Sequence, residues 1–371
     1  MWMPVLESGE LKTDPVRVSY WGTPLVLFRT ASGRLAALED KCAHRGVPLS
    51  RGSIRDENIR CGFHHFRFNA DGECVDVPSA FGADEAFRSR CSVRKFFVRE
   101  EIGLVWVSVE DESSSPFPVD LDDLPEDRVV VTGAFDAGGD IRIWMDHFLD
   151  MMHMLWAHAE SSFFGSAERP ADVESPSIGI TADSHYPVRP GVELDYLVRP
   201  ESPDARYALP IRTVMLLTRI RRRLRGGAGT GRAYRMHGRA DLLTPVCQDT
   251  WLNLGRMPIR VIASMNPIAE GKNRLVYASI CDGRGRSRMG RALARRLMRD
   301  AVRQHLGVED HNLLEQTPYL EDEQLNATEF DATIPAMRAV FTAYQRDKAK
   351  LYPDDSMIHH IRYGSQPTAD V

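Results

Sequence analysis

The 371-residue sequence lacks any run of about 18 apolar residues, the length that a helix needs to cross a membrane. Its first residues are not arranged as the basic segment and apolar stretch of a secretion signal. It also lacks an excess of positive charge, because 52 acidic residues outnumber 47 basic ones and the net charge is -5. We therefore expect a cytoplasmic protein with neither a membrane nor a nucleic acid as its partner.

Cysteine is scarce, with six residues in the whole chain. Four of them are scattered without a pairing pattern, and in a reducing compartment we interpret these as buried small apolar side chains: Cys74, Cys91, Cys247 and Cys281. A nucleotide-binding glycine fingerprint is also missing, because the glycine-rich run at 226–231 lacks the G-x-G-x-x-G spacing and no helix is expected after it. We interpret this run as a loop.

The length suits two domains, and 43% hydrophobic with 27% charged residues is ordinary for a protein with a sizeable core. A polar, proline-bearing stretch at 111–127 predicts a boundary, and we divide the chain into residues 1–115 and 116–371. Short strands are expected before the boundary, at 66–68 and 73–77. Antiparallel strands packed against helices are expected after it, which predicts an α+β fold.

Elements of the second part are predicted from their patterns. A helix is expected over 144–160, followed by an irregular region rich in Pro and Ser up to about residue 208. Strand-like runs then follow, at 211–220, 233–242, 249–254, 261–265 and 275–281. Helices are expected to return at 288–306, 308–317 and 330–350.

Two short pairs of metal-binding residues stand near the start of the chain. Cys42 with His44 and Cys61 with His64 spell C-x-H-x16-C-x2-H. Two thiolates and two imidazoles suit a [2Fe-2S] cluster in which one iron is held by both cysteines and the other by both histidines. A structural zinc ion would accept the same residue types, but zinc knuckles usually pair like ligands with like, whereas each pair here is mixed. The pattern therefore favours the cluster.

A second histidine pair, His153 and His158, lies in the pattern D-x2-H-x4-H that begins at Asp150. Mononuclear ferrous sites use two histidines and one carboxylate, although two histidines in an apolar helix are more often core residues when taken alone. Five residues of ideal α-helix turn through about 140°, so we predict a bulge or break between the histidines. Asp150 shares a face with His153, and its carboxylate is expected to hydrogen-bond that imidazole rather than bind iron.

With both motifs present, the chain resembles the Rieske non-heme iron oxygenases, the ring-hydroxylating oxygenase alpha-subunit family, over nearly its full length. The resemblance implies an N-terminal all-β Rieske domain followed by a helix-grip, START-like catalytic domain with an antiparallel sheet. Two residues depart from the family pattern. His65 follows the second cluster histidine where the family usually has glycine, and His147 stands where many members have asparagine. The roles of both are open.

The resemblance also implies the rest of a site. The family's carboxylate ligand lies on a late helix, where the acidic segment 308–316 offers Asp310, with Glu309 and Glu315 as alternatives. An ordinary acidic helix start is the other interpretation of this segment. The implied cofactors are the Rieske cluster, mononuclear Fe(II) and O2 as co-substrate. Electrons would come from NAD(P)H through a separate ferredoxin, flavin reductase or both. In the family's head-to-tail homotrimer, Asp150 would bridge the cluster of one subunit and the iron of the next.

Apolar side chains crowd the iron-binding segment and suit an aromatic or polycyclic substrate: Met145, Met151, Met152, Met154, Leu155, Trp156, Phe163 and Phe164. The runs at 61–68, 72–75 and 270–273 look like those of aminopyrrolnitrin oxygenase-like enzymes of natural-product pathways. We therefore expect a biosynthetic monooxygenase that performs hydroxylation, N-oxygenation or oxidative cyclisation. A catabolic ring-hydroxylating or O- or N-demethylating oxygenase is the alternative. An electron carrier and a binding protein for hydrophobic ligands are candidates from other classes.

Overall fold

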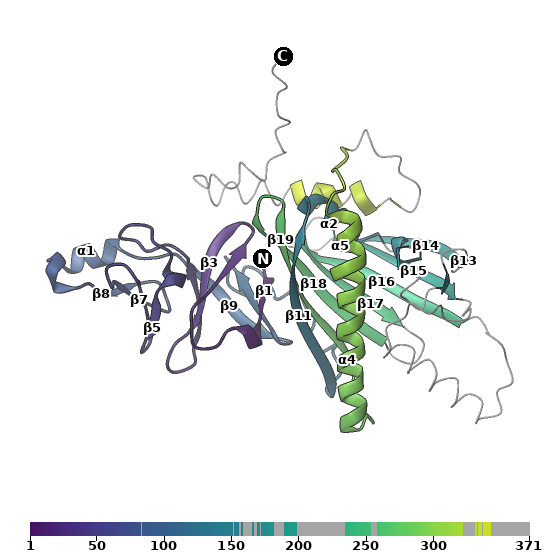
Figure 1. The fold of residues 1–371 in the computed structure, drawn as a ribbon, viewed down its shortest axis with the longest axis horizontal. Helices are drawn as coiled ribbons and strands as arrows, with labels where there is room; N and C mark the ends of the chain where they lie inside the picture. The colour runs from purple at the N-terminus through teal and green to yellow at the C-terminus, as the bar shows by residue number, and fades with distance from the viewer. Residues whose placement is uncertain are drawn as a thin grey trace, which may run out of the picture. The chain divides into compact units, whose positions relative to one another are not determined.

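The computed structural model describes residues 1–82, 84–150, 152–155, 157–158, 165–166, 169–170, 172–181, 189–198, 234–253, 258–321, 331, 333–335 and 337–342. The chain divides into two compact units (Figure 1). The described part of the first unit comprises Met1–Val119 and Ser264–Tyr277, and the second unit begins at Asp120. Among the described residues, no helix combines the length and the apolar character that crossing a membrane requires.

The first unit contains two antiparallel sheets. The larger one has the strand order β1-β10-β9-β4-β3-β2, with β1 (Met3–Glu7), β2 (Val16–Tyr20), β3 (Thr23–Arg29), β4 (Leu35–Glu39), β9 (Lys95–Glu101) and β10 (Leu104–Ser108). The smaller sheet has the order β5-β6-β7-β8, with β5 (Ser53–Arg55), β6 (Asn58–Arg60), β7 (Arg67–Asn69) and β8 (Cys74–Asp76). The strands predicted at 66–68 and 73–77 are thus confirmed as β7 and β8, shifted or shortened by about a residue.

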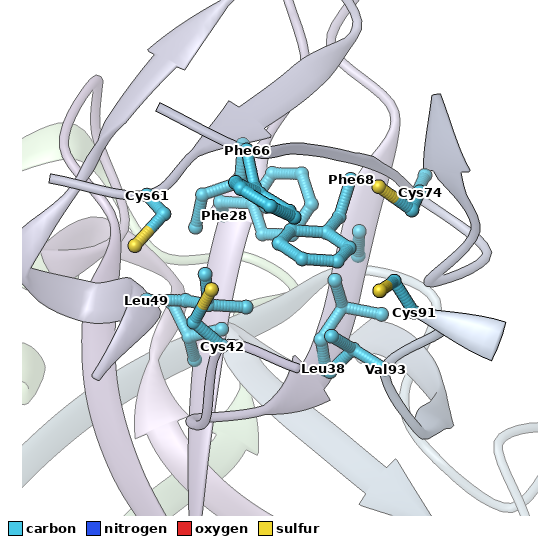
Figure 2. Packing of buried hydrophobic residues seen from close by; sticks show 14 residues of the cluster. Phe28, Leu38, Cys42, Leu49, Cys61, Phe66, Phe68, Cys74, Cys91 and Val93 are labelled. Atoms are coloured by element: carbon cyan, nitrogen blue, oxygen red, sulfur yellow. The ribbon is translucent and has the colours of Figure 1, made fainter. Parts of the chain in front are cut away.

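Short helical turns connect these strands: η1 (Ser8–Glu10), η2 (Leu49–Arg51), η3 (Ser79–Phe81) and α1 (Glu85–Arg90). A buried cluster of side chains packs inside this unit, with Phe28, Phe66 and Phe68 among its aromatic members. Cys42 and Cys61 lie at one end of the cluster, and Cys74 and Cys91 lie at the other (Figure 2). The apolar core therefore reaches the residues that the sequence assigns to the iron–sulfur cluster.

The second unit contains most of a seven-stranded antiparallel sheet of order β11-β19-β18-β17-β16-β15-β14, of which the stretch Ser264–Tyr277 belongs to the first unit. Its strands are β11 (Arg128–Gly138), β14 (Asp172–Thr181), β15 (Arg189–Val198), β16 (Tyr234–Thr244), β17 (Cys247–Asn253), β18 (Pro258–Ala269) and β19 (Lys272–Asp282), and the pair β12 (Gly165–Ser166) and β13 (Arg169–Pro170) lies apart from it. Helix α4 (Arg288–Gln304) packs Ala294 and Met298 against Val129, Val131 and Cys281 of the sheet. Its N-terminus is capped by the Ser287 side chain, which accepts a hydrogen bond from Gly290 N–H.

Comparison with the sequence prediction gives a mixed result for this sheet. The strands predicted at 233–242, 249–254, 261–265 and 275–281 are confirmed as β16 to β19, whereas 211–220 and the glycine-rich run at 226–231 lie outside the described residues. The irregular region predicted up to residue 208 is wrong where it is described, because β14 and β15 pair there. β14 is the edge strand, and its register shifts between Glu174 and Ser177, around Pro176. A bulged edge tolerates proline, which a sequence pattern counts against a strand.

The helix predicted over 144–160 is also wrong as a single element. Helix α2 (Ile141–Phe148) ends before it, and a separate short 3-10 helix η4 (His153–Leu155) follows. Later in the sequence, the chain passes from α4 into one wide π-helical segment η5 (His305–Asp310) and then into α5 (His311–Leu314). The helix predicted at 330–350 is described only in part, with helical residues at 333–335 and 337–342.

Two glycines in the first unit give a matched test of what the turns require. Gly33 and Gly72 both have positive φ, +87° and +81°, but only Gly72 would bring an added Cβ onto the carbonyl oxygen of Val93. We expect Gly33→Ala to cost about 1–2 kcal/mol, the price of a left-handed residue. Gly72→Ala should cost clearly more, because the backbone of Val93, whose N–H donates to the Gly72 carbonyl at 2.7 Å, has to move. Thermal unfolding of both variants measures this, and equal losses would contradict it.

Candidate metal centres

The four residues predicted to hold the cluster lie on two loops of the first unit. Cys42 and His44 follow β4, and Cys61 and His64 connect β6 to β7. Each loop is tightened by backbone hydrogen bonds, from Cys42 N–H to the Val47 carbonyl at 2.9 Å and from Cys61 N–H to the Phe66 carbonyl at 2.8 Å. The loops therefore present each mixed pair from a fixed backbone.

These side chains are arranged as a cluster needs them. Cys42 and Cys61 are unpaired, buried thiols that lie close enough to influence each other. The rings of His44 and His64 have centroids 4.7 Å apart. His44 Nδ1 is buried and meets no hydrogen-bond partner among the residues that the structure describes. Two neighbouring thiols and two neighbouring imidazoles, one with an orphaned nitrogen, fit the donor set of a Rieske cluster.

Burial also sets the chemistry of the thiols. Removal from water raises the pKa of Cys42 to about 12, and the adjacent Cys61 thiol adds to the shift. Such a thiol stays protonated at neutral pH unless a metal takes the place of its proton. Iron therefore has to take the place of the proton on Cys42 when it binds.

The departure at His65 has a structural explanation. His65 has φ of +62°, in the left-handed region that glycine adopts without strain. A hydrogen bond from its N–H to the Cys61 carbonyl, 3.2 Å long, closes the turn around the second pair. The side chain is exposed. The conformation of the loop thus favours glycine at this position, and the histidine adopts the same conformation at some cost.

A second group of metal-binding side chains gathers in the second unit around Asp310. Its side chain is 1% exposed, and neither carboxylate oxygen meets a hydrogen-bond donor in good geometry among the described residues. His158 Nε2 lies 3.3 Å from Oδ1, and His147 Nε2 lies 3.2 Å from Oδ2. A buried carboxylate that faces two imidazoles without accepting a hydrogen bond is suited to a metal ion.

The acidic neighbours of Asp310 do different things. Glu309 accepts a hydrogen bond from His158 Nδ1 at 2.7 Å, so the two consecutive carboxylates face the two nitrogens of one imidazole. Both carboxylates belong to the π-helical segment, a wide turn that often marks functional sites. Glu315, the other predicted substitute, is 48% exposed and lies 3.9 Å from His311. Of the three acidic candidates, Asp310 is the one that is fully buried beside the histidines.

His153 and His158 have neighbouring rings, although their ligand atoms belong to two different groups. The 3-10 helix and the turn at 157–158 replace a regular α-helix, which agrees with the predicted break, and the two ring centroids lie 5.2 Å apart. His153 Nδ1 contacts the backbone carbonyl of Asp150, which leaves Nε2 for a metal. The hydrogen bond expected between this imidazole as donor and the Asp150 carboxylate as acceptor is not made, because His153 Nδ1 lies 3.9 Å from Asp150 Oδ2. That carboxylate instead caps the turn, accepting from Met152 N–H at 2.9 Å and His153 N–H at 3.1 Å.

The sequence interpretation left His147 without a role, but the structure places it beside Asp310. The ligand atoms of His147, His153 and Asp310 all lie within 4.8 Å of one another. His158, His305 and Glu309 form a second group that meets the same criterion. The only signal in the sequence was the histidine at a family asparagine position, because the α4-to-α5 segment that brings Asp310 to His147 is distant along the chain.

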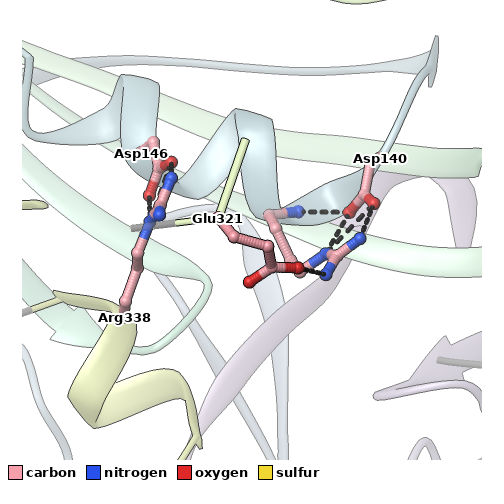
Figure 3. A network of polar contacts seen from close by, with 5 residues as sticks. Asp140, Asp146, Glu321 and Arg338 are labelled. Atoms are coloured by element: carbon pink, nitrogen blue, oxygen red, sulfur yellow. Dashed lines mark hydrogen bonds and ion pairs between the residues drawn. The ribbon is translucent and has the colours of Figure 1, made fainter. Parts of the chain in front are cut away.

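Helix α2, which carries His147, is held by a network of charged groups (Figure 3). Arg338 binds both carboxylate oxygens of Asp146, at 3.1 and 3.2 Å from Nε. Arg142 does the same with the capping residue Asp140. Both guanidinium groups lie over the ring of Tyr319, at 3.8 Å for Arg142 and 4.5 Å for Arg338. These bidentate pairs and cation–π contacts fix the orientation of the helix.

Charge is balanced closely in this site. Burial opposes a charge on His158, but the carboxylates of Asp310 and Glu309 outweigh it and raise its pKa to about 9. Burial likewise opposes the Asp310 carboxylate, yet the imidazoles of His147 and His158 hold its pKa well below the usual range. His158 is thus an imidazolium between the carboxylates of Glu309 and Asp310. A metal ion would take the place of the proton on the His158 ring.

Comparison with known proteins agrees with this geometry. Residues 1–92 match the family model of the Rieske [2Fe-2S] domain. The chain is 38% identical over 134 residues to the 3-chlorobenzoate-3,4-dioxygenase oxygenase subunit of Comamonas testosteroni, covering 35% of this chain and 31% of the relative. It is 31% identical over 173 residues to aminopyrrolnitrin oxygenase PrnD of Pseudomonas fluorescens, covering 43% of this chain and 45% of the relative. The matches span less than half the length of these curated relatives.

Solved structures show the same fold. Dicamba monooxygenase bound to 3,6-dichlorosalicylic acid superimposes with a TM-score of 0.66 at 18% identity, covering 94% of this chain and 98% of that one. NdmA of Pseudomonas putida CBB5 with caffeine gives a TM-score of 0.65 at 16% identity, covering 97% and 93%. The predicted fold class, α+β with an N-terminal all-β domain and a sheet-rich second domain, is confirmed. The chain therefore begins with a Rieske [2Fe-2S] domain and is a relative of the Rieske non-heme iron oxygenases that shares their fold.

Proposed function

We propose that this chain is a Rieske non-heme iron oxygenase that uses O2 and electrons from a separate reductase to oxidise an aromatic or polycyclic small molecule. One observation carries the proposal: two sets of metal donors occur in one chain. Cys42, His44, Cys61 and His64 form the first, and His153, His158 and Asp310 are the family's counterparts in the second. When bound, the cluster would store single electrons and the ferrous ion would activate dioxygen.

The chain's own residues would prepare the second site for that chemistry. Glu309 orients the His158 ring and leaves Nε2 toward Asp310. The Asp150 carbonyl does the same for His153. Among the described residues, the Asp310 carboxylate accepts no hydrogen bond in good geometry. Imidazole rings held in fixed orientations and a carboxylate with unoccupied acceptor positions are what a tightly held divalent ion needs.

The surroundings of the cluster histidines support a trimer in which one copy's cluster serves the next copy's iron. His44 and His64 are only half-buried, and Phe63 and Phe81 beside them are 55% and 43% exposed. Exposed aromatic side chains around a redox centre suit a protein partner. The Asp150 side chain is 36% exposed, so a histidine of another copy could reach it. A ferredoxin, a flavin reductase or both would supply the electrons.

The substrate class is proposed from relatives. Dicamba monooxygenase binds 3,6-dichlorosalicylic acid and NdmA binds caffeine, both of which are aromatic ring compounds. The match to PrnD supports a biosynthetic monooxygenase, while matches to vanillate O-demethylase of Pseudomonas keep demethylation as the second candidate. Of the predicted apolar lining, Met145 and Met154 are buried, Met152 is half-buried, and the side chains of Met151, Leu155, Trp156, Phe163 and Phe164 lie outside the description.

The cluster ligands can be tested with two cysteines of the same core. Cys42→Ser should abolish the cluster, because serine is a poor ligand for an iron–sulfur centre. Cys74→Ser changes a cysteine that is also buried, at the other end of that core, and this variant should retain the cluster. Acid-labile sulfide and visible absorption measure the result, with about two sulfides per chain expected for the parent protein. Retention of the cluster in Cys42→Ser would contradict the assignment.

Iron content separates the oxygenase from its rivals. We expect about three irons and two sulfides per chain, whereas an electron carrier or a ligand-binding protein would hold about two irons. Asp310→Asn should lower iron to about two and leave sulfide unchanged. Glu315→Gln, a change at the exposed acidic residue of the same segment, should keep three. An unchanged iron count in Asp310→Asn would exclude that residue as a ligand.

Asp150→Asn tests the proposed electron route. The amide keeps the capping oxygen, so both metals should remain bound, but the charged bridge between them is lost. We expect cluster oxidation in the presence of substrate and O2 to slow by at least about 10-fold while iron and sulfide stay at parent levels. Single-turnover absorption of the reduced cluster measures the rate. Product formation at the parent rate would rule the bridge out.

A further inference from the structure

We infer that His147 is a third imidazole ligand of the mononuclear metal, so that the ion is held by His147, His153, His158 and Asp310. This inference rests on the proposed mononuclear site and extends it. The family pattern supplies two histidines and a carboxylate, and many members have asparagine at this position. The structure nevertheless brings this side chain, 8% exposed, against the carboxylate that would hold the ion.

The first argument is the separation of the donor atoms. Two ligands at right angles on one ion, with bonds of about 2.1 Å, lie about 3 Å apart. His147 Nε2 is 3.2 Å from Asp310 Oδ2, and His158 Nε2 is 3.3 Å from Oδ1. Neither carboxylate oxygen meets hydrogen-bond geometry with these rings. The nitrogens thus lie at the separation of neighbouring ligands without the alignment of donor and acceptor.

The second argument is that the rings converge. His147 and His153 have ring centroids 4.0 Å apart, and His153 and His158 have centroids 5.2 Å apart. His153 is therefore near both of the other rings, and the ligand atoms of His147, His153 and Asp310 all lie within 4.8 Å of one another. The group of ligand atoms that includes Asp310 also includes His147, a buried side chain to which a site of two histidines would give no role.

The third argument is rigidity. His147 lies in the last turn of α2, and the helix is fixed by the bidentate pair between Arg338 and Asp146, one residue before it. The carbonyl of His147 accepts the N–H of Asp150 at 3.1 Å, which ties it to the capping turn of His153. A ligand held from both sides adds affinity at little cost in side-chain entropy.

The other candidate position for an ion, between His158, His305 and Glu309, is less suitable. His305 stacks on His158 with centroids 4.4 Å apart. The donor atoms there are already engaged, because Glu309 accepts from His158 Nδ1 at 2.7 Å and from Gln304 Nε2 at 3.0 Å. An ion would have to break both bonds. In the described part of the chain, the Asp310 oxygens make no hydrogen bond in good geometry that an ion would have to break, so a single ion is expected there.

Cobalt binding to the full chain tests the inference without turnover. The non-cluster metal is removed with a chelator while the Rieske cluster stays in place, and Co2+ is titrated and followed by its visible absorption and by metal analysis. We expect one Co2+ per chain in the parent protein. His147→Asn should weaken binding by about 10- to 100-fold and change the cobalt spectrum, because one nitrogen donor is lost.

A matched control is His311→Asn. His311 follows Asp310 in the chain, but its side chain stacks on Trp144 and accepts the Gly138 N–H, and it belongs to neither group of metal-binding side chains among the described residues. It should leave cobalt affinity and spectrum unchanged. In His147→Gly, added imidazole should restore affinity and spectrum if the missing group is a ligand. Circular dichroism and the cluster absorption confirm that each variant is folded.

The outcomes separate the two proposals. Cobalt binding by His147→Asn with parent affinity and an unchanged spectrum overturns the role of His147 and leaves the proposed oxygenase site intact. A parent chain that binds no Co2+ overturns the mononuclear site itself. Two Co2+ ions per chain overturn the single four-residue site in favour of separate positions. Weakened binding with a changed spectrum, restored by imidazole, establishes the ligand.

Discussion

The Asp310 carboxylate is buried and ionised, and none of the described residues offers it a hydrogen-bond donor in good geometry. The surrounding part of the second unit is arranged to meet that constraint. An isolated buried charge is too costly to persist, so a cation must lie against it. The His158 imidazolium meets this need in the metal-free chain, and a divalent ion would meet it in the loaded one. Three separate segments meet at this carboxylate. The π-helical segment carries Asp310, the end of α2 carries His147 and the turn at 157–158 carries His158.

The candidate cluster site differs in charge, because its buried Cys42 thiol is neutral without a metal. Its thiols lie in an apolar core with Phe66 and Phe68, and burial there favours the neutral thiol of Cys42 over its thiolate. Cys42 is therefore protonated in the metal-free chain, and iron has to take the place of that proton. The candidate centre at Asp310 thus contains a charge that a metal ion would neutralise. At the cluster site, by contrast, a metal has to ionise the neutral thiol of Cys42.

Regular structure supports both centres, but irregular backbone forms them. The cluster residues lie on turns between short strands, one of which is closed by His65 at positive φ. The second site uses a 3-10 helix, a tight turn and one wide π-turn. Consecutive carboxylates on that π-turn face both nitrogens of His158, a pairing that depends on the backbone of the segment. The sheets and the arginine pairs around Tyr319 hold these irregular segments in place.

The sequence by itself determined the chemistry that is local along the chain. The spacing of Cys42, His44, Cys61 and His64 predicted the Rieske domain, and the strands from β16 to β19 followed from their apolar patterns. It predicted a break near His153 because five residues of helix cannot face two histidines the same way. It misjudged β14 and β15, because an edge strand with a proline at a bulge carries a weak pattern.

Only the tertiary structure decided which of three acidic residues lies against the histidines, and that His147 joins them. Asp310 and His147 are separated by more than half of the second unit's sequence, and no periodicity links them. Their approach depends on where α4 packs on the sheet and where the chain widens into a π-turn. Such contacts arise from the packing of whole elements, which acts over distances in space and leaves no trace in local spacing.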